Sequence, residues 1–289
     1  MYTTFQHTRL CQYLLSLTIS FFILPPSQAS SVDKLCQEVS QKLRTVIYDT
    51  CLKMRWQPTG YQTAQGRPLV IREVTPIQNY PKGKILFIGG IHGDEYAAIS
   101  LTYLWLKTLL ENPAEVQYQW LFLPIANPDG LMQSPATRTN GQGVDLNRNF
   151  DTPDWNQLAL YNWRHHYQSA KRRYPGPYAA SEIETQWIQR LIQQFQPDAI
   201  ISLHAPYGLL DYDGPEHAEP NQIGALKLRP LGTYPGSLGR YAGEYLKIPV
   251  LTLELKHSGK MPNQQEIQTM WQDLKNWIAT KIKNKTLDF

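Results

Sequence analysis

Two histidines and one glutamate lie in segments that could hold a divalent metal. His92 and Glu95 occur in the segment GGIHGDE, three residues apart and directly after an apolar run. Where a strand passes into a helix, this spacing turns both side chains toward the same point. A catalytic zinc ion takes three nitrogen or oxygen ligands from the protein and keeps a fourth position for water. His204, which ends the apolar run IISLH, is the expected source of the second imidazole.

A single histidine at the end of a strand is more often a hydrogen-bonded structural residue than a metal ligand. Glycines and two acidic residues surround His92 in its turn, and this crowding favours the metal site. A further carboxylate, Glu254, lies in the apolar segment IPVLTLELK, where burial without a partner would be costly. A water activated by the metal would be such a partner, with Glu254 accepting its proton as it attacks a carbonyl. The alternative partner is Lys256 at the exposed end of the same segment.

The elements that must position these residues alternate between short apolar runs and amphipathic segments. Buried strands are expected at KILFIGG, VQYQWLFLPIAN, DAIISLH and IPVLTLELK, and helices are expected over residues 33–45 and 96–110 and from 262 onward. This order indicates an α/β domain with a mainly parallel sheet and helices on both faces. The candidate residues all lie at or just beyond the end of an expected strand. In such sheets the chemistry gathers at the carboxyl ends of the strands.

One long segment, residues 131–178, is predicted to be irregular because it is dense in Asn, Gly, Pro and Tyr. A stretch of this length within a compact domain is usually a functional loop region. After it, Ser181 and Glu184 have the spacing of a capping box for a helix that runs to Gln196.

Residues 1–29 are expected to be a secretory signal peptide. Arg9 precedes the apolar run from Leu14 to Leu24, and the small residues of PPSQAS follow, so cleavage is expected near Ala29. The apolar run is shorter than the roughly 20 residues that a helix needs to cross a bilayer. The mature chain is therefore expected in the bacterial periplasm or outside the cell, without a stable membrane anchor.

Cysteine usage agrees with export, and the net charge argues against one class of partner. Removal of residues 1–29 would leave Cys36 and Cys51 as an even pair in an oxidising compartment, where a disulfide is expected. The bond requires the opening helix to end before Cys51, and two separate buried thiols are the alternative. The net charge of +4 falls by one when Arg9 is removed, which is too small to imply a nucleic-acid partner.

An ordered set of segments between about residues 59 and 256 resembles the zinc carboxypeptidase family. The segments are IHGDE, NPDG, RTNGQGVDLNRNF, GPYAASEIET, ISLHAP, YPGSLG and LTLEL, and their spelling is most similar to the bacterial murein peptide amidase branch. The resemblance implies a twisted sheet of mixed, mainly parallel direction with eight strands and flanking helices. It also implies that residues 30–289 form a single catalytic domain with a short helical extension at the N-terminus.

Carried over residue by residue, the resemblance implies one zinc ion held by His92, Glu95 and His204, with Glu254 as the general base. The two residues that directly follow His204 differ from those of the digestive members of the family. Those members have Ser and Tyr there, whereas this chain has Ala205 and Pro206, as in the murein branch.

Four further residues match functional positions of the family, and a fifth is a candidate for one. Asn147 and Arg148 match the pair that binds the terminal carboxylate, a task that suits a guanidinium because it can bond both oxygens. Arg138 matches the arginine that stabilises the oxyanion, and Asp145 matches the carboxylate that orients the first zinc histidine. Tyr234 is the candidate for the tyrosine that covers the bound substrate.

These features predict a zinc metallopeptidase that hydrolyses an amide bond next to a free carboxylate. The resemblance points to the γ-D-glutamyl to meso-diaminopimelate bond of murein peptides, so the expected partner is a murein-derived peptide. A zinc amidohydrolase that deacylates N-acyl amino acids is an alternative. A murein-binding protein without catalytic activity is another, and it would lack a metal ligand or the base, whereas all four residues are present here.

Overall fold

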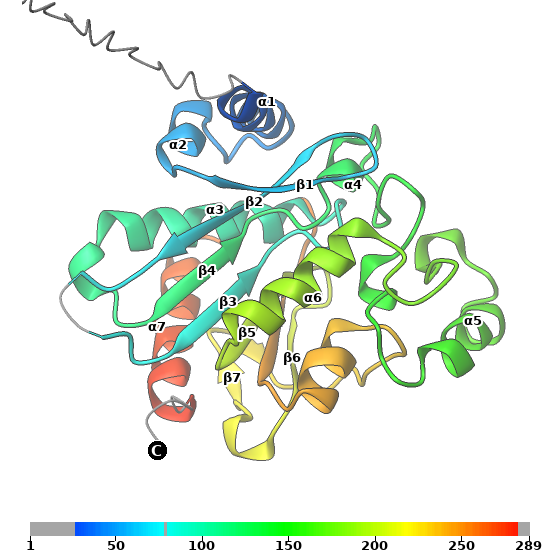
Figure 1. Cartoon of the computed structure of the whole chain (residues 1–289). Helices are drawn as coiled ribbons and strands as arrows, with labels where there is room; N and C mark the ends of the chain where they lie inside the picture. Colours follow the sequence, from blue (N-terminus) through cyan, green and yellow to red (C-terminus); the bar gives the residue numbers. More distant parts are fainter. Residues whose placement is uncertain (1–26, 78–79, 283–289) are drawn as a thin grey trace, which may run out of the picture.

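The computed structural model describes residues 27–77 and 80–282, and within them the chain forms a seven-stranded sheet in the order β1-β2-β4-β3-β5-β9-β6 (Figure 1). The expected signal sequence lies almost wholly outside the described residues. Among those that are described, no helix combines the length and the apolar character needed to cross a bilayer. The strands of the sheet are β1 (Gln57–Gln62), β2 (Pro68–Val74), β3 (Lys84–Ile88), β4 (Gln119–Leu123), β5 (Ala199–His204), β6 (Leu209–Asp213) and β9 (Val250–Glu254).

The four central strands β4, β3, β5 and β9 run parallel, and antiparallel strands flank them on both sides. The predicted mixed α/β sheet is therefore confirmed. It has seven strands in the described residues, where the family resemblance implies eight. At the edge beyond β6, Leu228 makes only one isolated bridge, to Leu210. Pro230 follows two residues later and has no N–H group with which to extend the pairing.

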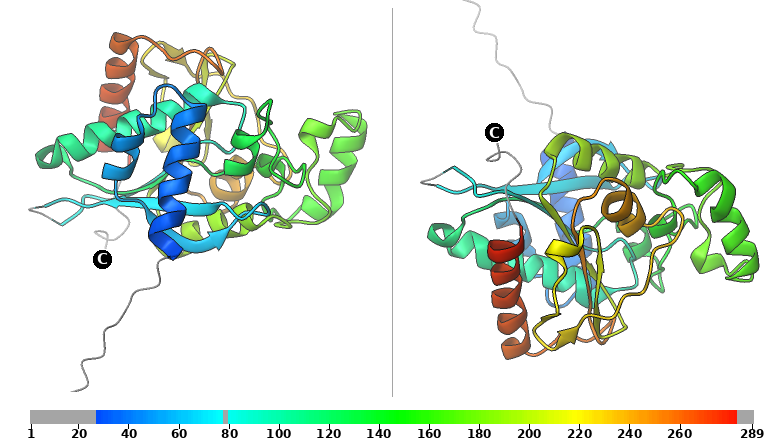
Figure 2. Two further views of the ribbon diagram at one scale, coloured as in Figure 1. Left: turned by 90° about the horizontal axis from the view of Figure 1, so that it is seen from above. Right: turned by 90° about the horizontal axis from the view of Figure 1, so that it is seen from below.

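Helices cover both faces of the sheet and give two apolar core layers (Figures 1 and 2). Side chains of β3 alternate between the layers, with Ile85 and Phe87 in one and Leu86 and Ile88 in the other. This alternation is the period of two that a strand buried on both faces requires. The helices are α1 (Ser27–Lys42), α2 (Tyr48–Lys53), α3 (Tyr96–Glu111), α4 (Pro128–Met132), α5 (Trp155–His165), α6 (Ile183–Phe195), α7 (Gln264–Lys281) and a π-helix η5 (Gly239–Tyr245).

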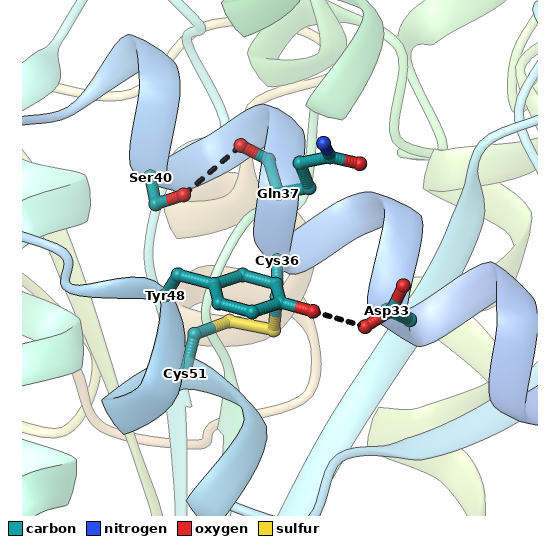
Figure 3. Close-up of a disulfide and its surroundings, with 6 residues drawn as sticks. All are labelled: Asp33, Cys36, Gln37, Ser40, Tyr48 and Cys51. Atoms are coloured by element: carbon teal, nitrogen blue, oxygen red, sulfur yellow. Dashed lines mark hydrogen bonds between the residues drawn. A yellow bond between two sulfur atoms is a disulfide. The ribbon is translucent and has the colours of Figure 1, made fainter.

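The N-terminal helices α1 and α2 pack on the core and are joined by a disulfide. Figure 2 shows α1 lying across β1 and β2, and Figure 3 shows the bond between Cys36 of α1 and Cys51 of α2. The chain leaves the helical conformation after Lys42, so α1 ends before Cys51 and the two Cα atoms come to 5.7 Å. Both sulfur-bearing side chains are fully buried.

Replacing both cysteines, C36S together with C51S, is expected to lower the free energy of unfolding by about 2–4 kcal/mol. The bond closes a loop with a sequence separation of 15, and its loss would restore conformational freedom to the unfolded chain. Urea denaturation at pH 7 measures the difference. The cysteines do not line the cleft described below, so peptidase activity at 25 °C should stay unchanged. Equal denaturation midpoints for the variant and the wild type would contradict the expectation.

The prediction of a capping box at Ser181 and Glu184 is wrong. Helix α6 begins at Ile183, its N-cap is Glu182, and Ser181 Oγ donates to the Glu182 carboxylate at 2.6 Å. Glu184 instead points into the protein and is fully buried, where its carboxylate accepts from Asn140 Nδ2 at 3.3 Å. The spacing of Ser181 and Glu184 suits a capping box. In the folded protein, however, the Glu184 carboxylate accepts a hydrogen bond from the loop around Asn140 instead.

Burial raises the pKa of Glu184 to about 7 from the ordinary 4.5. Between these values the folded protein holds a proton that the unfolded chain releases, so the free energy of unfolding falls as the pH rises through this window. Glu184→Gln should therefore stabilise the protein at pH 8, by at most about 3 kcal/mol, and change little at pH 4.5. Urea denaturation at the two pH values measures this, with exposed Glu216→Gln as the control. A variant that is less stable at pH 8 would contradict the prediction.

Candidate functional site

The candidate residues meet at the carboxyl-end edge of the parallel strands. His92 and Glu95 lie in the turn between β3 and α3, where Glu95 is the N-cap residue of the helix. His204 and Glu254 are the last residues of β5 and β9, and they face each other in register across this parallel pair. Segments that are up to 162 residues apart in sequence are thereby brought to one place.

Three side chains converge closely enough to share a metal ion. Nδ1 of His92 lies 2.7 Å from one oxygen of Glu95, and Nδ1 of His204 lies 3.0 Å from the other. The two Nδ1 atoms are 3.1 Å apart. Ligands bonded tetrahedrally at about 2.0 Å from zinc would be separated by about 3.3 Å, so the nitrogen spacing fits. All three side chains are buried, and in the described part of the chain they form the single cluster of this kind.

The charges of the cluster suit a cation between them. Burial alone would raise the pKa of Glu95, but the imidazoles of His92 and His204 outweigh burial and hold the pKa far below its usual range. Burial would likewise lower the pKa of His204, whereas the neighbouring Glu95 carboxylate raises it overall. Glu95 is therefore an anion at neutral pH, as a metal-binding carboxylate must be.

Asp145 and Arg138 support this cluster from one side. Asp145 Oδ1 lies 3.2 Å from Nε2 of His92, so it can accept that proton and leave Nδ1 free to face Glu95. Arg138 donates through Nε to Asp145 Oδ2 at 2.8 Å, and its Nη1 lies 3.2 Å from His92 Nδ1. Burial would raise the pKa of Asp145, but Arg138 and His92 together lower it well below its ordinary value.

The NPDG turn holds the loop that carries Arg138. Asn127 accepts from Gly130 N at 2.8 Å through Oδ1, and its Nδ2 donates to the backbone oxygen of Arg138 at 3.2 Å. Asp129 in the same turn is fully buried and accepts from Thr63 Oγ1 at 2.7 Å. These contacts explain why the segment is polar although it lies inside the protein.

Glu254 faces the metal cluster and makes no ion pair with a lysine or arginine among the described residues. It is 6% exposed, and its Oε2 atom is buried without a hydrogen bond in the described residues. Burial raises the pKa of its carboxyl group, and His204 counteracts this only in part. Lys256, the alternative partner in sequence, lies 4.0 Å from Glu266 instead. The Tyr207 backbone also gives this carboxylate a hydrogen bond, which leaves Oε2 as the oxygen available to a ligand in the cleft.

Arg148 and the side chains around it line the same cleft as the metal cluster. The guanidinium of Arg148 lies 4.4 Å from the ring centroid of Tyr234, and its Nη2 donates to the Tyr167 hydroxyl at 3.3 Å. Asn147 accepts through Oδ1 from Leu238 N at 2.8 Å, which fixes its side chain. The two tyrosine rings contact each other with their centroids 5.7 Å apart. Tyr234 thus lies over Arg148 and lines the same cleft.

Most of these side chains line one cleft of about 500 Å³, whereas Asp145, Asn127 and Asp129 lie outside its lining. The sequence-predicted residues that the cleft brings together are His92, Glu95, Arg138, Asn147, Arg148, His204, Tyr234 and Glu254.

Sequence reasoning missed other residues of this cleft: Tyr167, Arg172, Arg173, Ser202, Asp211 and Asp213. Arg172 pairs at the rim with Asp94 at 3.2 Å. The segment LLDYD of β6 does carry a strand signal, because its apolar and polar residues partly alternate. Its two aspartates argue against a strand, because aspartate is rare in strands, and β6 was therefore not predicted.

Comparison with known proteins decides the family. The sequence pattern described as "Zinc carboxypeptidase" matches residues 59–222, which is more than half of the chain. The chain belongs to the zinc carboxypeptidase family. It is a hydrolase of the metallopeptidase class, and zinc is the metal that this family implies for the cluster of His92, Glu95 and His204.

Two relatives within this family carry the name murein peptide amidase A. The protein from Vibrio campbellii is 30% identical over 208 residues, which cover 68% of this chain and 79% of the relative. The protein from Escherichia coli K12 is 31% identical over 180 residues, which cover 58% and 69%.

Solved structures of the family share the fold. The crystal structure of murein-tripeptide amidase MpaA from Escherichia coli O157 aligns with a TM-score of 0.56 and 25% identity, over 76% of this chain and 90% of that one. Carboxypeptidase A from Helicoverpa armigera aligns with a TM-score of 0.60 and 19% identity, over 86% and 71%.

Proposed function

We propose that this protein is a murein peptidase in which His92, Glu95 and His204 hold one zinc ion and Glu254 is the general base. The observation that carries the proposal is the convergence of two imidazole nitrogens and a carboxylate beside Glu254, a second buried carboxylate whose Oε2 atom has no partner in the described part of the chain. A binding protein without catalytic activity would have no use for this second carboxylate. When bound, zinc would polarise the scissile carbonyl and lower the pKa of the attacking water.

The remaining chemistry belongs to the side chains of the cleft. Glu254 takes the proton of the attacking water and passes it to the nitrogen of the leaving amine. Arg138, held by Asp145, donates hydrogen bonds to the oxygen that becomes negative as the carbonyl is attacked. Asp145 keeps the proton of His92 on Nε2, so that Nδ1 remains a ligand.

We assign the binding of the substrate's free carboxylate to Arg148 and Asn147. A guanidinium fork can bond both carboxylate oxygens, and the ring of Tyr234 lies over the guanidinium of Arg148. The names of the two amidase relatives and of the solved amidase support a murein peptide as the substrate. Hydrolysis at the γ-D-glutamyl to meso-diaminopimelate bond would release diaminopimelate.

Such a substrate requires the enzyme to reach the murein layer. We assign residues 1–29 to a signal peptide, and the catalytic domain with its helical extension to residues 30–289. The disulfide between Cys36 and Cys51 supports an oxidising compartment such as the periplasm.

Purified mature protein loaded with zinc and incubated with L-Ala-γ-D-Glu-meso-diaminopimelate should release free diaminopimelate, which mass spectrometry detects. An N-acetyl amino acid is the control, because a deacylase would cleave it and a murein peptidase would not. Cleavage of ordinary α-peptides with no release from the murein tripeptide would overturn the substrate while leaving the metal centre intact.

Arg148→Lys is expected to raise the KM of this reaction about 10- to 100-fold with a smaller change in kcat. Lysine keeps the charge but loses the planar fork and its contact with the ring of Tyr234. Steady-state kinetics separates the two parameters. Arg190→Lys, an exposed replacement next to Tyr61, is the matched control. An unchanged KM would remove Arg148 from the substrate site.

A further inference from the structure

Helix α5 lies at one end of the molecule, apart from the sheet (Figures 1 and 2), and the 3-10 helix η3 (Lys171–Arg173) follows it. Between residues 155 and 181 the chain has four lysine or arginine residues and no aspartate or glutamate. The net charge of the whole chain is +4, so this one segment accounts for all of the excess positive charge. A local concentration of one sign of charge attracts partners of the opposite sign.

The inner face of α5 fixes the helix to the protein. Trp155 is buried, and its Nε1 donates to the backbone oxygen of Arg148 at 2.8 Å. Near the other end of the helix, Trp163 Nε1 donates to the backbone oxygen of Ala170 at 2.9 Å, and its ring contacts that of Tyr174 with the centroids 4.9 Å apart. These contacts hold α5 and the start of η3 in one arrangement without using the outer side chains of the helix.

The outer face of α5 carries an apolar and aromatic stripe. Leu158, Tyr161 and His165 are spaced three and four residues apart, so they lie on the same side of the helix. Leu158 is 38% exposed and Tyr161 is 54% exposed, and the ring centroids of Tyr161 and His165 are 4.3 Å apart. Single exposed apolar side chains are normal, but a contiguous group of them indicates a contact surface. The apolar face of a sugar ring can pack on aromatic rings presented in this way.

Two free cations lie beside this stripe at the C-terminal end of α5. Arg164 is in the last turn of the helix, and Lys171 directly follows Ala170, which is bonded to Trp163. Both are exposed, and in the described part of the chain neither makes an ion pair or a side-chain hydrogen bond. They therefore remain available to carboxylates of a partner.

We propose that the outer surface of α5 docks the protein on the glycan polymer of murein, outside the catalytic cleft. This docking surface consists of Leu158, Tyr161, Arg164, His165 and Lys171. None of the five lines the cleft, so the surface is separate from the peptide-binding site. Murein offers both kinds of partner, because its sugar rings can pack on the stripe and its peptide branches carry carboxylates that pair with the two cations.

An anionic membrane is the other partner that the charge of this surface would attract. A helix that lies on a bilayer buries a large apolar face among the lipid chains. On the docking surface Leu158 is the one aliphatic side chain, and an aromatic pair takes the place of such a face. The chemistry therefore favours the glycan.

The identity of the polymer rests on the proposed murein peptidase function, but docking is measured apart from turnover. Zinc-loaded mature protein is sedimented with purified insoluble murein at about 0.05 M and about 0.5 M NaCl. The wild-type protein should sediment with murein, and its affinity should fall as the salt concentration rises. Retained sedimentation without cleavage of soluble L-Ala-γ-D-Glu-meso-diaminopimelate would count against the peptidase and not against the docking surface.

Two variants separate the aromatic stripe from the cations. Tyr161→Ala should lower the affinity for murein about 2- to 10-fold at both salt concentrations. Arg164→Gln combined with Lys171→Gln should lower it about 3- to 30-fold at low salt and make it less dependent on salt. Neither variant touches the cleft, so kcat/KM for the soluble tripeptide should change less than about twofold.

Matched controls come from exposed positions elsewhere on the molecule. Tyr80→Ala removes a tyrosine that is 97% exposed, and Arg44→Gln combined with Lys53→Gln removes two charges beside α1 and α2. These controls should bind murein as the wild-type protein does. Equal binding by the wild type and the α5 variants, or equal weakening by the controls, would overturn the docking surface. Binding to phosphatidylglycerol vesicles without binding to murein would overturn the glycan as its partner.

Discussion

Replacing Glu254 with glutamine is expected to lower kcat about 100- to 10,000-fold while the protein retains its zinc. Glutamine has nearly the same shape but cannot accept a proton from the attacking water. Glu254 makes no ion pair with the protein, and its Oε2 atom has no hydrogen-bond partner in the described residues. The glutamine oxygen can still accept the backbone hydrogen bond that Tyr207 gives to Glu254, so the replacement removes the proton acceptor from the cleft and keeps this contact.

Steady-state kinetics and metal analysis on the same preparation measure the two halves of this expectation. Glu216→Gln, at an exposed glutamate away from the cleft, controls for the loss of a carboxylate and should retain full activity. A Glu254→Gln protein with wild-type kcat would exclude Glu254 as the base. A protein that lost its zinc would assign Glu254 to the metal instead.

Replacing His204 with alanine is expected to abolish both zinc binding and turnover. In the proposed zinc site His204 is one of three donors, and its Nδ1 lies 3.0 Å from the Glu95 carboxylate. Its loss would leave two ligands, which is fewer than the three that catalytic zinc sites use. The wild-type protein should unfold at a higher temperature with zinc than without it, because the metal binds the folded state, and His204→Ala should lose this difference.

Zinc stoichiometry after dialysis and thermal unfolding with and without added zinc measure this second expectation. His217→Ala is the matched control, because His217 is exposed and does not line the cleft. Retention of one zinc per chain by His204→Ala would show that the metal is held elsewhere.

The sequence was most informative where apolar runs end in polar residues. His204 and Glu254 close two such runs, and parallel pairing of β5 and β9 places them directly opposite each other. The position of His92 and Glu95 between β3 and α3 followed from the same reasoning. These placements could be predicted because a parallel sheet gathers its strand ends at one edge.

Part of the cleft lining could not be predicted from local patterns. Asp211 and Asp213 disfavour a strand by their own propensity, and only pairing with β9 places them in β6. Glu184 had the spacing of a cap, but its contact with Asn140 depends on a loop that is 44 residues away in sequence. The position of Tyr167 beside Arg148 depends on how an irregular segment folds. Hydrophobic periodicity does not predict which residues of such a segment face the cleft.

The most direct test of the metal centre is a crystal structure of the zinc-loaded protein with diffraction data collected on both sides of the zinc absorption edge. We predict one anomalous peak, bonded to Nδ1 of His92, Nδ1 of His204 and the carboxylate of Glu95, with Glu254 facing it. A peak bonded to other side chains, or no peak at these three donors in protein that contains zinc, would contradict the account.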